Sequence, residues 1–153
     1  MIEIDVEPYY ILSKKHQLLT IIDNTFLTPY LSTPLEEGAD IVLHSATKYI
    51  GGHNDVLAGV VTVKDAQLAE QLNQFHNMIG ATLSPLDSYL LQRGLKTLHL
   101  RIERSQENAQ KLAQRCRQSD SIDEVLYSGR TGMLSLRLNQ ACLLYTSPSP
   151  RDS

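Results

Sequence analysis

The chain has 153 residues, of which 42% are hydrophobic and 20% charged. A chain of this length and composition can bury one hydrophobic core and is expected to form one domain. Its formal net charge of −3, without a basic cluster, excludes the electrostatic pattern typical of nucleic-acid binding. No apolar run approaches the roughly 20 residues that a membrane helix needs, and the start lacks a signal-peptide pattern, so we expect a cytoplasmic protein.

The first part of the chain predicts a helix, a strand and a second helix. Residues Pro8–His16 are typical of a helix, and the apolar run Leu18–Ile22 predicts a buried strand that ends at Asp23. Thr33–Glu36 has the form of a helix start, with a hydroxyl cap, a proline in the first turn and a glutamate that can complete a capping box. Gly38 should end this short helix, because glycine accepts the left-handed conformation found at helix ends.

The next apolar run, Ile41–His44, predicts a second buried strand, which a compact crossover makes parallel to the first. Two hydroxyls and an amine follow it, on Ser45, Thr47 and Lys48. Ligands bind beyond the carboxyl ends of parallel strands, so these groups could hold a phosphate and attack a carbonyl, with Asp23 of the neighbouring strand close to Lys48. The alternative is a surface loop with a solvated lysine, since such clusters are common in loops.

The residues after this loop predict a third strand and a helix. Gly59–Val63 is again apolar, and Asp65 can cap the helix that follows. The apolar residues of this helix recur on one face, which we expect in the core: Leu68, Leu72, Phe75 and Ile79.

The last predicted elements are a long helix and two strands. Ser84 and Pro85 begin a helix expected over residues 85–116, long enough to link two domains. Residues 123–127 and 133–138 predict strands, the second with an alternating pattern typical of one solvated face.

Six segments resemble, in order and spacing, the cystathionine γ-synthase/β-lyase family of pyridoxal-phosphate enzymes of cysteine and methionine metabolism: IDNTF (22–26), PLEEGAD (34–40), HSATKY (44–49), GHNDVLAG (52–59), IGATLSP (79–85) and RGLKTL (93–98). The resemblance implies an α/β fold, part of the large domain of a fold-type I (aspartate aminotransferase-like) enzyme. That domain has a mostly parallel sheet flanked by helices. Residues 1–118 would form it in part, and residues 119–141 would begin a small α+β C-terminal domain.

The resemblance also implies pyridoxal 5'-phosphate as cofactor and a role for each site residue. Lys48 would bind the cofactor aldehyde covalently and then act as the general base at the α-carbon. Asp23 would keep the pyridine nitrogen protonated, and Ser45 and Thr47 would donate hydrogen bonds to the phosphate. Thr25 would lie beneath the ring. The implied reaction is elimination or replacement at the β- or γ-carbon of a sulfur amino acid, in a homo-oligomer of two or four chains.

The chain departs from the family pattern at both ends. The family's phosphate loop, its ring-stacking tyrosine and a tyrosine-arginine pair that reaches the neighbouring subunit have no counterpart, and Arg137 lies too early to be the arginine that binds the substrate carboxylate. A competing hypothesis is therefore a truncated, catalytically incompetent fragment with a packing or oligomerisation role. A third alternative, a nucleotide-binding α/β protein, would need a glycine fingerprint that is not visible.

Two remaining features carry no predicted chemistry. His44 and His53 lack a third ligand and a ligand-like spacing, so we expect structural histidines and no metal. Residues 142–153 match nothing in the family and resemble a translated sequencing adapter, so we expect the natural sequence to end near Ala141. Cys116 would then be the one native cysteine, because Cys142 falls in this tail.

Overall fold

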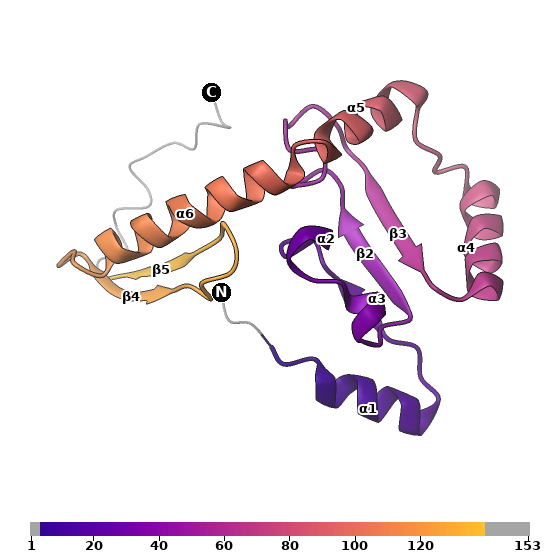
Figure 1. The fold of residues 1–153 in the computed structure, drawn as a ribbon, viewed down its shortest axis with the longest axis horizontal. Helices are drawn as coiled ribbons and strands as arrows, with labels where there is room; N and C mark the ends of the chain where they lie inside the picture. Colours follow the sequence, from indigo (N-terminus) through magenta and orange to yellow (C-terminus); the bar gives the residue numbers. More distant parts are fainter. Residues whose placement is uncertain (1–3, 140–153) are drawn as a thin grey trace.

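The computed structural model describes residues 4–139 (Figure 1). The predicted tail, residues 142–153, lies outside this range. The elements of the described chain, in order, are α1 (Glu7–His16), β1 (Ile21–Asp23), α2 (Thr28–Leu31), α3 (Pro34–Glu37), β2 (Ile41–Ser45), β3 (Gly59–Val63), α4 (Ala66–Ile79), α5 (Pro85–Leu95), α6 (Leu98–Cys116), β4 (Ile122–Leu126) and β5 (Ser135–Leu138).

The first sheet has three strands in the order β1-β2-β3, with β2 in the centre. Strands β1 and β2 are parallel, with Asp23 opposite Leu43, which confirms the predicted crossover. The crossover contains α3 as predicted and also the short helix α2, which the sequence analysis missed. In α3 the Thr33 hydroxyl donates to the Glu36 carboxylate at 2.9 Å and makes no hydrogen bond to the helix backbone, so only part of the expected capping box forms.

Strand β3 runs antiparallel to β2, with Ser45 opposite Gly59. The described sheet therefore pairs one parallel and one antiparallel neighbour, a departure from the mostly parallel sheet that we expected. The connection over residues 46–58 contains turns and no helix, so the chain reverses direction beside β2. A parallel return would require a crossover, usually through a helix.

The predicted helix over residues 85–116 is two helices, α5 and α6, interrupted at Lys96 and Thr97. Its end at Cys116 is as predicted. The break arises at Gly94, whose carbonyl accepts from the Thr97 amide at 3.2 Å and from Arg101 Nη2 at 2.7 Å. A continuous helix would pair that carbonyl with the amide of residue 98.

Helix α4 begins as predicted and packs differently. The Asp65 carboxylate accepts from the Leu68 amide at 2.7 Å, which confirms the cap. The prediction that its apolar face lies in the core is wrong, because α4 has no buried residue and Phe75 and Ile79 are 64% and 75% exposed. Helix α4 lies at the margin of the described chain beyond β3 (Figure 1), and no described element covers its outer face.

The second sheet is the antiparallel pair β4-β5, at the far end of α6 from the first sheet (Figure 1). An irregularity between Ile122 and Glu124 shifts the register. Arg137 Nη1 lies 3.0 Å from Glu124 Oε2 across the pair, where the two side chains form an exposed ion pair.

Candidate active site

Asp23 and Ser45 are joined by Thr25 at the ends of β1 and β2. The Thr25 hydroxyl donates to Asp23 Oδ1 at 2.6 Å and accepts from the Ser45 amide at 2.7 Å. The Thr25 amide also donates to Asp23 Oδ1 at 3.0 Å. The second carboxylate oxygen, Oδ2, makes no hydrogen bond to residues 4–139. Thr25 thus orients the Asp23 carboxylate and leaves one oxygen available to a ligand.

The loop after β2 holds Lys48 in a tight turn. The Lys48 amide donates to the Ser45 carbonyl at 3.1 Å, and the Gly51 and Gly52 amides donate to Ala46 and Lys48 carbonyls at 2.7 and 2.8 Å. Lys48 itself is exposed, and its amine forms no hydrogen bond or ion pair within the described chain. The turn therefore fixes the backbone and leaves the amine free to react.

Beneath the turn lies an apolar cluster that includes Ala46, Ile50, Val56 and Leu91. The first two belong to the turn, Val56 to the connection toward β3, and Leu91 to α5. Burial of these side chains, which stabilises by roughly 25 cal/mol per Å² of apolar surface, anchors the turn to α5.

The two predicted phosphate-binding hydroxyls differ in their surroundings. Thr47 Oγ1 donates to the Ala58 carbonyl at 3.3 Å and accepts from the Ala58 amide at 2.9 Å, so it closes the connection between β2 and β3. The Ser45 hydroxyl makes no hydrogen bond to residues 4–139. Of the two, Ser45 is the hydroxyl that is free to donate.

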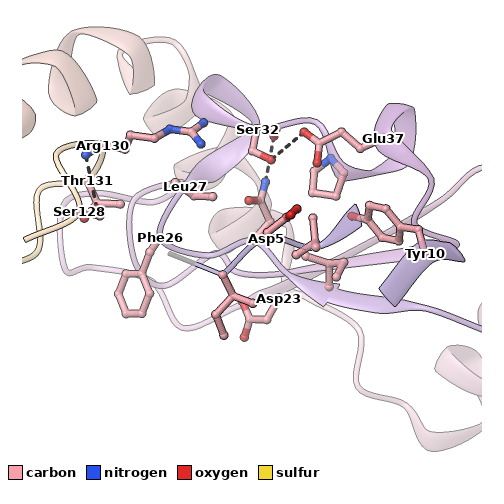
Figure 2. A pocket seen from close by; sticks show the side chains of 15 residues that line it. Asp5, Tyr10, Asp23, Phe26, Leu27, Ser32, Glu37, Ser128, Arg130 and Thr131 are labelled. Carbon is pink, nitrogen blue, oxygen red and sulfur yellow. Dashed lines mark hydrogen bonds between the residues drawn. The ribbon is translucent and has the colours of Figure 1, made fainter. Parts of the chain in front are cut away.

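Asp23 and Lys48 line neighbouring cavities that share Phe26. The Asp23 cavity has a volume of about 620 Å³, and Arg130 and Thr131 lie on one side of it with Tyr10 and Glu37 on the other (Figure 2). The Lys48 cavity, of about 910 Å³, is lined by Thr47, Lys48 and residues of α6. The parallel strands therefore bring Asp23 and Lys48 to adjacent cavities. Phe26, which lies within the IDNTF segment, was not among the site residues predicted from the sequence.

His44 precedes Ser45 in β2, so its side chain lies on the opposite face of the strand, where it is buried. Its Nε2 lies 3.3 Å from Asn24 Nδ2, and its Nδ1 is buried without a partner in the described chain. Burial lowers the pKa of His44, and the nearby Asp23 carboxylate opposes this shift more weakly. Burial thus favours the neutral form of His44 beside the Asp23 strand end.

His53 is turned toward its own loop, with Nδ1 2.8 Å from the Gly51 carbonyl. Within residues 4–139 no group of three or more His, Cys, Asp or Glu side chains could hold a metal ion. Nor is any helix of that range long and apolar enough to cross a membrane.

The sequence profile of a family described as Cys/Met metabolism PLP-dependent enzyme matches residues 1–139. The chain belongs to this family. A cystathionine gamma-synthase/O-acetylhomoserine (thiol)-lyase of Bacillus subtilis is 56% identical over 92% of the chain, which covers 38% of that relative. A cystathionine beta-lyase of Lactococcus lactis subsp. cremoris is 51% identical over 82% of the chain, which covers 33% of the relative.

Solved structures of family members share the fold. A cystathionine gamma synthase of Xanthomonas oryzae in complex with cystathionine has a TM-score of 0.86 at 38% identity, over 90% of this chain and 40% of that one. A cystathionine gamma-lyase of Lactobacillus plantarum complexed with L-serine has a TM-score of 0.84 at 38% identity, over 87% and 39%. The chain thus has the fold-type I architecture and spans about two-fifths of these enzymes.

Members of the family depend on pyridoxal phosphate, and the exposed groups at this site fit that cofactor. A carboxylate oxygen of Asp23 is available to a pyridinium N–H, and the Ser45 hydroxyl is available to a phosphate oxygen. The unpaired Lys48 amine is the nucleophile that an aldehyde requires.

Proposed function

We propose that this protein takes part in pyridoxal-phosphate-dependent elimination or replacement at the β- or γ-carbon of a sulfur amino acid, such as cystathionine or an activated homoserine. The observation that carries the proposal is that Asp23 ends β1 and Lys48 lies in the turn directly after the parallel strand β2, in cavities that share Phe26. The names of the similar lyases and synthases support the substrate class.

Each site residue has a proposed task. Lys48 would bind the cofactor covalently and, once released, move the proton at the substrate α-carbon. Asp23, oriented by Thr25, would hold the proton on the pyridine nitrogen. Ser45 would donate to the phosphate, and Thr47 would donate to it in place of its present bond to the Ala58 carbonyl. Bound pyridoxal phosphate would supply the electron sink for the carbanion formed when the proton leaves.

Cofactor attachment is the direct test. The purified chain is incubated with pyridoxal phosphate, reduced with borohydride and mapped by peptide mass spectrometry. Label should concentrate on Lys48, disappear in Lys48→Ala and persist in Lys64→Ala, which removes another exposed lysine that follows a strand. Label distributed evenly over the lysines would contradict the proposal.

Product analysis distinguishes the β and γ reactions. Elimination at the β-carbon of cystathionine consumes water and yields homocysteine, pyruvate and ammonia. Elimination at the γ-carbon also consumes water and yields cysteine, 2-oxobutyrate and ammonia. Replacement would instead join cysteine to an activated homoserine and release the activating acid. Quantifying the two oxo acids and the thiols therefore identifies the carbon that loses its substituent.

A second candidate is that these 153 residues have a packing or homo-oligomer role without turnover of their own. Its support is a set of exposed apolar side chains near the first sheet, each at least half exposed: Leu18, Leu19, Ile21 and Val61. Surfaces of this kind mark contacts with further protein. Lyase turnover by the chain, abolished in Lys48→Ala, would defeat this candidate.

A further inference from the structure

Arg101 of α6 bonds to three groups around the Lys48 turn. Its Nη1 donates to the Tyr49 carbonyl at 2.6 Å and its Nη2 to the Gly94 carbonyl at 2.7 Å. Its Nε donates to Thr97 Oγ1 at 3.1 Å. One guanidinium thus joins the residue after Lys48 to the end of α5 and the start of α6.

Close packing around this turn restricts side chains at two glycines, at Gly52 through Arg101 and at Gly94 through the turn backbone. A Cβ on Gly52 would meet the Arg101 guanidinium, and Gly52 has a φ of +75°, which favours glycine. A Cβ on Gly94 would clash with the Ile50 and Gly51 carbonyl oxygens. Removal from water lowers the pKa of Arg101, which agrees with a guanidinium packed on backbone.

We propose that Arg101 is a positioning residue for Lys48: its guanidinium fixes the turn over residues 46–52 against α5 and thereby sets the direction of the Lys48 amine. This inference rests on the proposed function, in which Lys48 binds the cofactor. The planar fork of an arginine can donate to two carbonyls at fixed angles, whereas a lysine ammonium acts as a compact point charge. The position therefore requires arginine geometry as well as positive charge.

The first readout is amide hydrogen exchange of the chain without cofactor. In Arg101→Met the Gly51 and Gly52 amides, which close the Lys48 turn, should exchange about tenfold faster, because the loss of charge-assisted bonds frees the turn to open. Arg101→Lys should show most of the same increase. In Arg115→Met, which changes an exposed arginine on the same helix, the Gly51 and Gly52 amides should exchange as they do in the unchanged chain.

The second readout is the position of borohydride-fixed pyridoxal phosphate. Arg101→Met and Arg101→Lys should lose at least about half of the label at Lys48 relative to the other lysines, and Arg115→Met should keep it. Wild-type exchange and labelling in Arg101→Met would overturn the proposal. So would wild-type behaviour of Arg101→Lys, since charge alone would then suffice.

The two readouts separate this inference from the proposed function. If the unchanged chain does not label at Lys48, the proposed function fails, and with it the role of Arg101 toward the cofactor. If Lys48 labels normally and exchange at Gly51 is unchanged in both Arg101 variants, the inference alone fails. Amides of the β4-β5 pair serve as reference: equal acceleration there in both variants would show a general loss of folding and would also overturn the proposal.

Discussion

The Thr25 hydroxyl donates a 2.6 Å hydrogen bond to Asp23 Oδ1 and accepts a 2.7 Å bond from the Ser45 amide. Its one donor proton and one of its two acceptor lone pairs join the ends of two parallel strands. Thr25 is also buried, with 7% of its surface exposed. We therefore propose that it acts on the cofactor through Asp23, whereas the sequence analysis expected it beneath the ring.

Thr25→Val should destabilise the fold. The valine keeps the shape of the side chain but leaves the Ser45 amide without its acceptor, which costs about 1–3 kcal/mol for a buried polar group. Urea unfolding measures this loss. Thr33→Val is the matched control, because that hydroxyl bonds to Glu36 on the surface, and it should change stability by less than about 0.5 kcal/mol. Equal effects in the two variants would refute the assignment of Thr25.

His44 should make stability depend on pH. Its folded pKa is lowered by burial, while an unfolded histidine titrates near pH 6.5. Below that pH the unfolded chain binds a proton that the folded chain resists, so the contribution of His44 is present above the unfolded pKa and is lost as the pH falls toward the folded pKa. His44→Gln should reduce this dependence, because glutamine is of similar length and does not titrate.

The measurement is the free energy of unfolding by urea at about pH 7.5 and pH 5.5. The unchanged chain should lose more stability than His44→Gln between the two conditions. The same slope in both proteins would mean that other groups cause the pH dependence.

Gly94→Ala should separate α5 from the Lys48 turn. The new methyl would clash with the Ile50 and Gly51 carbonyl oxygens, which cannot move as a flexible side chain can. Overpacking of this kind costs about 1–3 kcal/mol. In Gly59→Ala the new Cβ meets only the His44 carbonyl at 3.9 Å, so stability should stay constant or rise slightly. Thermal unfolding of both variants provides the comparison, and a harmless Gly94→Ala would contradict the close packing.

Helix α4 should promote self-association through its exposed apolar face. Phe75→Gln combined with Ile79→Gln removes side chains that are 64% and 75% exposed. Stability should change by less than about 0.5 kcal/mol, because little packing is lost, while association falls. Sedimentation velocity at several concentrations checks this. A large loss of stability with unchanged association would show that the face packs within the chain.

The elements that sequence patterns predicted well are those fixed by short-range chemistry. The Asp65 and Ser84 caps form as expected, since an N-cap side chain bonds to an amide only two or three residues away. The apolar run before Lys48 forms β2, and its parallel partner ends at Asp23. Membership of the pyridoxal-phosphate family follows the order of the quoted segments and is confirmed.

The predictions that failed depend on contacts between residues far apart in the sequence. The apolar periodicity of α4 predicted a core face, but periodicity identifies an apolar face without saying what covers it. The break between α5 and α6 depends on Arg101 reaching the Gly94 carbonyl and on Gly94 contacting the turn at Gly51, which no local pattern shows.

The sequence by itself determined the chemistry available here: a lysine amine, a carboxylate and hydroxyls, placed after apolar runs that become neighbouring strands. Only the tertiary structure decided how those groups are held. Thr25 orients Asp23, Thr47 is bonded to Ala58, and Arg101 holds the turn that carries Lys48. The physical reason is that a hydrogen bond depends on distance and angle between atoms that folding brings together, and these are set by the packing of the whole chain.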